Sequence, residues 1–214
     1  MQYRDWEPTY KEILADFGFD RAKDEEAARI AAEILSRSDN KNEHVEQELE
    51  RLIKGKAVVI CGNAPCLVGD ITEQNIFTAS RVVIAADGAT SVLLHKDIIP
   101  HIVVTDLDGN VADILYANQL GAVIVVHAHG DNIELLRTVL PTLRGNVICT
   151  TQSKPIHKVY NFGGFTDGDR CVFLANEFGA MEIVLLGFDF EDTEVSARKK
   201  KKLKWAKRLI GGVL

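Results

Sequence analysis

Short apolar runs alternate with segments of helical length after Lys56. The runs are AVVIC, RVVIAA, HIVVT, AVIVVH, NVICT and EIVLLG. Almost every position in them is apolar, whereas a strand with one face in water alternates apolar and polar residues. Strands that are apolar on both faces are typical of a parallel sheet between two layers of helices. We therefore predict an α/β fold with a doubly wound, mostly parallel, Rossmann-like sheet of about six strands.

The first quarter of the chain has a helical period instead. Apolar residues three and four positions apart predict helices over 6–17, 22–38 and 43–53. Gly18 is expected to end the first helix and Asp20 to cap the second.

No catalytic pattern occurs in these helices, and Trp6 is predicted to be a packing anchor. We divide the chain into an N-terminal helical region, residues 1–54, packed on the core, and an α/β catalytic domain, residues 55–214. The second part ends in a basic C-terminal helix.

The composition fits a protein with one sizeable core, because 46% of the 214 residues are hydrophobic. A net charge of −6 weighs against a general nucleic-acid binder, although the C-terminal part is basic. No apolar run approaches the roughly 20 residues that a membrane helix needs, and the polar start has no signal-peptide pattern. Four cysteines without CxxC spacing indicate reduced thiols in a cytoplasmic protein. The sequence is compatible with a homo-oligomer.

Polar clusters follow the apolar runs, and the most specific one is Thr105-Asp106-Leu107-Asp108-Gly109. The carboxyl ends of parallel strands meet at one edge of a sheet, where α/β proteins bind their ligands. Asp106 and Asp108 place two carboxylates on one short turn, which suits Mg²⁺ that carries phosphate oxygens. The competing interpretation is a purely structural turn. We predict a Mg²⁺-dependent nucleotide site.

The next run ends in His127-Ala128-His129-Gly130-Asp131-Asn132. Two imidazoles and a carboxylate follow a strand that neighbours the acidic turn. HxH spacing is also found in zinc sites, but zinc needs a third protein ligand. Near neutral pH, His127 and His129 are suited to contact phosphate or to move protons. Asp131 is a further candidate for the metal site.

The first two runs end in Cys61-Gly62-Asn63-Ala64-Pro65-Cys66 and in Ala86-Asp87-Gly88-Ala89. Gly62 allows close approach of the backbone to a phosphate, and a helix over 71–79, capped by Asp70, is expected to follow. The segment lacks both GxGxxG and a GK[ST] ending, so a tight turn is an equal alternative. Asp87 suits a ribose hydroxyl, a metal-bound water or a helix cap.

The later clusters suit a flat heterocycle. Thr151 and Gln152 offer neutral hydrogen bonds to a ring edge. The glycine-rich segment Asn161–Arg170 is predicted to fold over a ring, with Phe165 against it and Asp167 or Asp169 at the start of the next helix. The alternative is a long turn with an N-cap.

The basic run from Arg198 to Arg208 is predicted to be helical. Lys202 and Lys204 are the residues we expect to meet the negative charge of a polyphosphate. A solvated helix face is an equal alternative, and no motif supports binding to nucleic acid.

Taken together, these segments resemble the archaeal 6-hydroxymethyl-7,8-dihydropterin pyrophosphokinases over almost the whole chain. The resemblance lies in GNAPC, ADGAT, PHIVVTDLDGN, HAHGDN, TTQ, NFGGFTDGDRC and LLGFDF, and in the N-terminal W-x3-Y-x2-I and DFGFD. A more distant similarity to thiamin pyrophosphokinases covers Ala86–Ala89 and Pro100–Gly109. This chain has HAHGDN where that second family has an acidic cluster, and it has no room for that family's C-terminal β-sandwich.

The resemblance implies transfer of a diphosphate from ATP to the hydroxymethyl group of a reduced pterin, with release of AMP, in a folate- or methanopterin-type pathway. ATP is then the co-substrate and Mg²⁺ the cofactor. The residues assigned to this reaction are Asp106, Asp108, Asp87 and Asp131 for the metal, His127 and His129 near the phosphates, Gly62, Asn63, Asp87, Gly88, Lys202 and Lys204 for the nucleotide, and Thr151, Gln152, Phe165, Asp167 and Asp169 for a ring. The alternatives are a thiamin pyrophosphokinase, a sugar-nucleotide-dependent transferase and a non-catalytic nucleotide-binding protein.

Overall fold

The computed structural model describes residues 2–37, 44–73 and 81–214. Their strands form one sheet in the order β6-β5-β4-β3-β2-β1-β7, and all neighbouring strands are parallel. The six predicted strands are all present, and a two-residue strand, β6, extends the sheet at one edge. The strands are β1 (Ala57–Cys61), β2 (Arg81–Ala86), β3 (Ile102–Thr105), β4 (Val123–Ala128), β5 (Val147–Thr151), β6 (Val159–Tyr160) and β7 (Glu182–Leu186).

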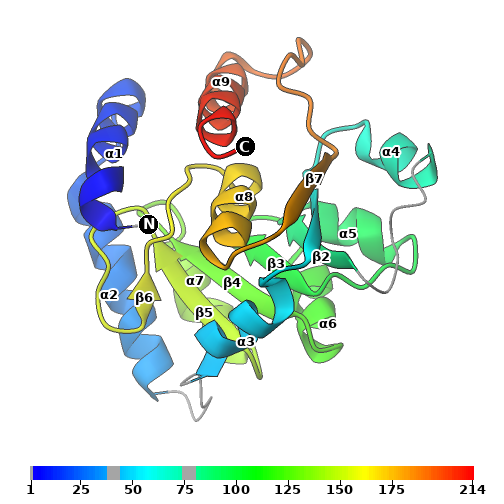
Figure 1. Cartoon of the computed structure of the whole chain (residues 1–214). Coiled ribbons are helices and arrows are strands. Elements are labelled where there is room, and N and C mark those ends of the chain that lie inside the picture. The colour runs from blue at the N-terminus through cyan, green and yellow to red at the C-terminus, as the bar shows by residue number, and fades with distance from the viewer. Residues whose placement is uncertain (1, 38–43, 74–80) are drawn as a thin grey trace.

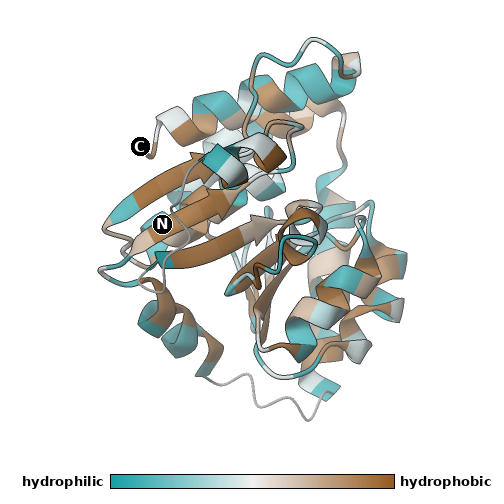
Figure 2. Ribbon diagram, turned by 90° about the vertical axis from the view of Figure 1, so that its right-hand side faces the viewer, coloured by the Kyte–Doolittle hydropathy of each residue, from teal (hydrophilic) through white to brown (hydrophobic). Residues whose placement is uncertain are grey.

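Helices cover both faces of the sheet, as the apolar strands predict (Figure 1). In β1, Val59 and Cys61 belong to the core on one face, and Val58 and Ile60 to the core on the other. Figure 2 shows the strands as hydrophobic along almost their full length. The first core includes residues of α2 (Arg21–Arg37), α4 (Leu67–Glu73), α5 (Ala89–Leu94), α6 (Val111–Gln119) and α7 (Ile133–Thr138), and the second includes residues of α3 (Val45–Ile53), α8 (Asp167–Glu177) and α9 (Ala197–Gly211).

The order of the strands explains where the site lies. From β1 to β5 each new strand is added on the same side of the previous one, and α4 to α7 pack on one face of the sheet. The chain then crosses the other face through α8 and adds β7 beside β1. The strand order therefore reverses at β1, and the carboxyl edge near such a reversal is where α/β proteins bind ligands.

Helix α1 (Tyr3–Phe17) ends at Gly18, which has a φ of +68°, as predicted. Trp6 is 2% exposed and packs edge-to-face against Phe173 of α8, so its role as a packing anchor is confirmed. Helix α1 also packs against α9, which lies at the same end of the molecule (Figure 1). Helices α2 and α3 thus belong to the two cores beside the sheet, whereas α1 packs on α8 and α9.

Asp20 caps α2 as predicted, because its Oδ1 accepts the N–H of Ala22 at 2.9 Å. The helix expected over 71–79 is different: α4 begins at Leu67, so Asp70 lies inside it. The Asp70 carboxylate accepts the N–H of Gly187 instead. Positions 74–79 of that prediction, and the ends of the predicted helices at 38 and 43, lie outside the described residues.

The four cysteines are free thiols, three of them buried and Cys66 exposed. In the part of the chain that the structure describes, no helix has the length and apolar character to cross a membrane.

Candidate active site

A cavity of about 560 Å³ lies along the carboxyl edge of the sheet. Its volume falls in the range of pockets that bind small molecules. Loops after β1, β2, β3, β4, β5 and β7 reach it, together with the start of α8 and one side of α9. The predicted residues that line it are Gly62, Asn63, Asp87, Gly88, Asp106, Asp108, His129, Asp131, Gln152, Phe165, Asp167 and Lys202. The predicted residues outside its lining are His127, Thr151, Asp169 and Lys204.

The acidic turn after β3 has an unusual backbone conformation. Leu107 has a φ of +70° and is 1% exposed, so its side chain inserts into the core while Asp106 and Asp108 face the cavity. The Leu107 N–H donates to Oγ1 of Thr105 at 2.8 Å. A left-handed conformation is uncommon for a leucine, and such strain is concentrated at functional sites.

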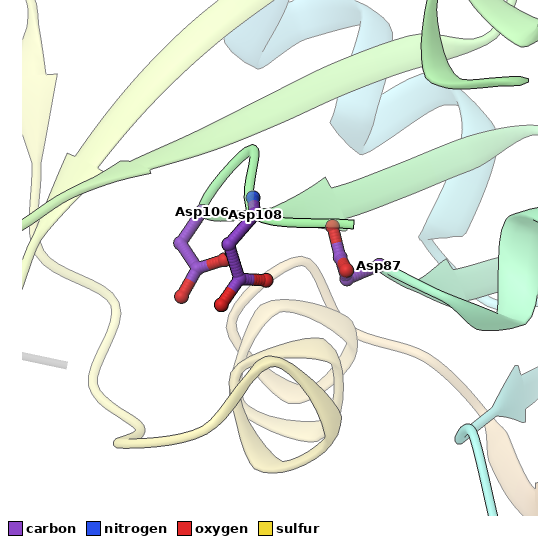
Figure 3. Close-up of side chains that lie close together, drawn as sticks. All are labelled: Asp87, Asp106 and Asp108. Atoms are coloured by element: carbon purple, nitrogen blue, oxygen red, sulfur yellow. Dashed lines mark hydrogen bonds between the residues drawn. The ribbon is translucent and has the colours of Figure 1, made fainter. Parts of the chain in front are cut away.

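Asp87, at the end of β2, lies beside this turn. The Thr105 hydroxyl donates to Asp87, and a Cβ atom at Gly109 would overlap the Asp87 carboxylate. One oxygen from each of Asp87, Asp106 and Asp108 lies within 4.8 Å of the others, and Figure 3 shows the three carboxylates facing a common space. Among the residues that the structure describes, this is the group of acidic, histidine or cysteine side chains suited to hold a metal ion. Asp131 is exposed and is not part of it.

The electrostatics of the three carboxylates fit a cation. Burial, and then the hydrogen bond and charge of Asp106, raise the pKa of Asp108. Burial is also the main cause that raises the pKa of Asp87. Burial opposes ionisation of Asp106, but hydrogen bonds from His129 and Asp108 outweigh it and lower its pKa. Crowded carboxylates of this kind are stabilised by a divalent cation with oxygen ligands.

Asn132 and His129 connect the acidic turn to β4. The Asn132 side-chain amide donates to the backbone oxygens of Asp106 and His127, at 2.7 Å each. His129 Nε2 lies 3.2 Å from Oδ2 of Asp106. The sequence pattern singled out the histidine, and the structure adds Asn132 as the residue that joins the two strand ends.

His127 does not reach the cavity. It is 2% exposed, its Nδ1 lies 3.0 Å from Oγ1 of Thr150, and Nε2 has no partner among the described residues. Burial, followed by the positive charge of Arg170, lowers the pKa of His127. The structure therefore places His127 in the core and outside the cavity, and His129 is the histidine of this pair that lines it.

Two of the residues predicted to contact a ring are structural. Thr151 Oγ1 lies 3.0 Å from the Ser153 hydroxyl inside the core. Asp169 is fully buried and forms the capping box of α8 with Thr166, so the N-cap alternative holds for it. Gln152 and Phe165 do line the cavity.

Gly62 is adjacent to the cavity, but its lack of a side chain serves another contact. A Cβ atom there would lie 2.6 Å from the Gly187 backbone oxygen and 3.0 Å from the Phe188 ring. The glycine therefore lets the loops after β1 and β7 pass each other where the strand order reverses. Gly88 similarly makes room for the Asn63 side chain.

The cations divide into those that face the cavity and those that do not. Lys202 lines it, and burial, followed by the charge of Arg170, lowers the pKa of Lys202. Lys204 is exposed in a separate groove beside Asp16 and Trp205, because two residues turn the helix by about 200° away from Lys202. The structure therefore places Lys204 outside the cavity.

Several cavity residues were missed by the sequence interpretation. Helix α2 and the loop before it contribute Phe19, Lys23 and Asp24, although the N-terminal part showed no catalytic pattern. Arg170 was present in the glycine-rich segment but received no role. Phe188 and Phe190 follow β7 and line the other end of the cavity; the aromatic residues flanking Asp189 were the available signal.

The fold and the site together define a class: a parallel α/β protein with a three-carboxylate cluster in a cavity at the carboxyl edge. Comparison with known proteins is more specific. Residues 35–195 match the family described as 6-hydroxymethylpterin diphosphokinase MptE-like. The chain belongs to this family, as the sequence motifs predicted.

Three similar proteins carry the name 6-hydroxymethyl-7,8-dihydropterin pyrophosphokinase. The protein from Methanothermobacter thermautotrophicus is 43% identical, over 98% of this chain and 94% of its own length. The proteins from Pyrococcus furiosus and Methanocaldococcus jannaschii are 42% and 39% identical, over 98% of this chain and 93% and 95% of theirs.

Proposed function

We propose that this protein is a 6-hydroxymethyl-7,8-dihydropterin pyrophosphokinase, which transfers a diphosphate from ATP to the pterin hydroxymethyl group and releases AMP. Its membership of the family and the name of its relatives support the reaction. One observation in the structure supports it most. The acidic cluster shares one cavity with two pairs of aromatic side chains, which are Phe19 with Phe165 and Phe188 with Phe190.

The strand order gives that placement. Asp87 and the acidic turn follow β2 and β3, in the middle of the sheet. Phe165, which packs against Phe19, lies in the cavity near Gln152 at the end of β5. Phe188 and Phe190 follow β7, on the other side of β1. A reaction between two molecules that each carry a flat ring, with phosphates between them, fits this arrangement.

We assign Mg²⁺ to Asp87, Asp106 and Asp108, and the fit rests on their crowded oxygens and on the raised pKa values of Asp87 and Asp108. Mg²⁺ held by these carboxylates would supply positive charge to the phosphates during transfer. The protein's own contribution is to hold the carboxylates, through Thr105, His129 and Asn132, and to place Lys202 across the cavity.

The substrate hydroxyl attacks the β-phosphorus in line, so catalysis is mainly positioning and charge neutralisation. Neither histidine offers a free nitrogen to the cavity. Nδ1 of His129 accepts the N–H of Asp131 at 3.2 Å and its Nε2 is bonded to Asp106, whereas His127 is buried. We therefore assign no proton transfer to an imidazole.

The test is AMP formation from ATP and Mg²⁺ with the pterin or with thiamin as acceptor. We expect AMP with the pterin, and a loss of about 10³-fold or more in Asp106→Asn and Asp108→Asn, because their charge holds the metal. Asp131→Asn is the matched control, since Asp131 lines the cavity outside the cluster, and we expect its activity to stay within about threefold of wild type.

The outcomes separate the alternatives. AMP with thiamin alone identifies a thiamin pyrophosphokinase. Tight binding of a CMP- or UDP-sugar without cleavage of ATP identifies a sugar-nucleotide transferase. Binding of ATP and Mg²⁺ in a calorimeter, with no AMP from either acceptor, identifies a non-catalytic protein. Full activity in both asparagine variants contradicts the metal assignment.

A further inference from the structure

Arg170 is a buried cation that lines the cavity, and one of its nitrogens has no partner in the described part of the chain. It is 8% exposed and lines the cavity from the second turn of α8. Its Nη1 donates to Oδ1 of Asp167 at 2.9 Å. Its Nε is buried and has no partner among residues 2–37, 44–73 and 81–214. A guanidinium carries five N–H donors, and leaving them unpaired in a buried position is costly.

The segment before α8 holds Arg170 in place. A Cβ atom at Gly164 would lie 2.8 Å from Cα and Cγ of Arg170, and Gly164 has a φ of +90°. The Asp169 carboxylate accepts the N–H groups of Phe165 and Thr166, which fixes the first turn of the helix. The glycine-rich loop predicted to cover a ring is therefore packed against the arginine backbone.

The surroundings of Arg170 are those of an anion site. The N-terminus of the 11-residue helix α8 lies at the cavity, which is lined by Thr166, Asp167 and Gly168. The helix dipole favours negative charge at this end. Lys202 of α9 lines the same cavity. The charge of Arg170 acts on both Asp106 and Lys202, and all three residues line the same cavity.

We propose that Arg170 binds non-bridging oxygens of the nucleotide's diphosphate. Its guanidinium and the acidic cluster would then contact the same phosphates. A guanidinium matches phosphate oxygens in a bidentate fashion, and its charge adds to that of the metal on the group being transferred. This assignment rests on the proposed function, and it identifies the substrate phosphates as the partner of Arg170. Arg170 is then a catalytic residue that the sequence interpretation did not include.

The alternative is that Arg170 only neutralises Asp167, three residues earlier on the same helix. The two interpretations differ when both partners are removed. A purely structural pair leaves ligand binding intact once Asp167→Asn and Arg170→Gln are combined. If Arg170 binds phosphate, the double variant binds the ligand weakly, because the guanidinium is missing although every other contact to phosphate is kept.

The experiment measures binding of α,β-methylene-ATP with Mg²⁺ by calorimetry, because this analogue cannot lose its terminal diphosphate. We expect Arg170→Gln to weaken binding about 10- to 100-fold, as for loss of hydrogen bonds to a charged group. Arg170→Lys is expected to recover part of the loss, since it restores the charge but not the planar set of donors that binds phosphate in a bidentate fashion. Lys207→Gln, exposed on α9 and outside the cavity lining, is the matched control and binds as wild type does.

The double variant Asp167→Asn/Arg170→Gln covers the case in which Arg170→Gln alone does not fold. Weak binding by this folded double variant supports the proposal, and binding within about twofold of wild type overturns it. The readout is independent of the pterin. A wild-type protein that binds the analogue but forms no AMP contradicts the proposed function and leaves the test of Arg170 intact.

Discussion

Nε2 of His129 lies 3.2 Å from Oδ2 of Asp106, and the two residues follow neighbouring strands, β4 and β3. Nδ1 of the same ring accepts the Asp131 N–H at 3.2 Å, so the hydrogen of the ring is on Nε2 and is donated to the carboxylate. His129 therefore orients one of the three proposed metal ligands without facing the substrate through a free nitrogen. It is a positioning residue.

Replacing His129 by Ala should lower kcat/KM about 10- to 100-fold, the usual cost of losing a partner that orients a metal ligand. The loss should appear mainly as a higher Mg²⁺ concentration at half-maximal rate. His129→Gln should recover part of it, because its amide can donate to Asp106. AMP formation measured over a range of Mg²⁺ concentrations is the assay, and exposed His95→Ala is the control. An unchanged Mg²⁺ dependence in His129→Ala would show that the contact has no such role.

The acidic cluster should make stability depend on pH. Burial raises the pKa of Asp87, of Asp108 and of Asp167, and raises that of Asp169 to about 6. In each case the folded state holds its proton more tightly than the unfolded chain, whose carboxyls titrate near about pH 4. The stability contributed by these four groups is therefore present at low pH and is lost as the pH rises through their folded pKa values. Asp106, whose pKa is lowered, contributes stability that is lost only below about pH 4.

His127 acts in the opposite direction. Its lowered pKa means that the unfolded chain takes up a proton below about pH 6.5 while the folded protein does not, so this contribution is lost as the pH falls. Burial also lowers the pKa of His101, which acts in the same direction as His127, and four carboxyls outweigh these two imidazoles. We expect the free energy of unfolding without Mg²⁺ to decrease between pH 5 and pH 7.5.

Urea unfolding at both pH values, with and without Mg²⁺, is the measurement. Mg²⁺ should stabilise the protein more at pH 7.5, where the carboxylates are ionised, and at 100 times its Kd the gain is about 2.7 kcal/mol. Asp108→Asn should reduce this gain. Equal stabilisation at the two pH values would contradict the assignment of these carboxylates to the metal.

The sequence predicted the sheet well because burial on both faces leaves a clear record: all six apolar runs are strands. It also brought Asp87, Asp106, Asp108 and His129 to one edge, since residues that directly follow parallel strands must meet there. The two-residue β6 left no such record, because two residues are too short to show a period.

Whether a given side chain reaches the cavity was not predictable in the same way. His127 and His129 are two positions apart on the end of β4, and only the second reaches the cavity. Lys202 and Lys204 belong to one basic run, and the rotation of α9 decides which of them faces the cavity. These outcomes depend on contacts between segments far apart in the chain, which periodicity does not record.

Asp24 shows how such a distant contact supports the site. Its buried carboxylate accepts the Tyr10 hydroxyl at 2.7 Å, the Gln152 amide at 2.8 Å and the Gly130 N–H at 2.9 Å. It thereby joins the start of α2 to α1 and to the loops after β4 and β5. Burial, and then the charge of Asp24, raise the pKa of Tyr10, which stays protonated as the donor.

Asp24→Ala should lower the free energy of unfolding by about 3 kcal/mol, because it leaves three buried donors without an acceptor. Asp20→Ala is the matched control, four residues earlier at the N-cap of the same helix, and should cost only about 1 kcal/mol. Denaturant unfolding monitored by circular dichroism measures both. Equal losses in the two variants would mean that Asp24 acts as a helix-start residue and does not join the segments.

Gly164 and Gly121 allow the cost of backbone strain to be separated from the cost of displacing Arg170. Both glycines are left-handed, with φ values of +90° and +100°. A Cβ atom at Gly121 meets nothing within 4 Å, whereas one at Gly164 would lie 2.8 Å from Arg170.

Gly121→Ala should therefore cost only the strain, about 1 kcal/mol, and leave activity unchanged. Gly164→Ala should cost about 1–3 kcal/mol more, because the start of α8 has to shift. It should also reduce kcat/KM, since Arg170 and Asp167 move with that turn. Thermal unfolding and AMP formation on the two purified variants measure these effects. A Gly164→Ala protein that matches Gly121→Ala in both would show that the close packing of the loop on Arg170 is not needed to place the guanidinium.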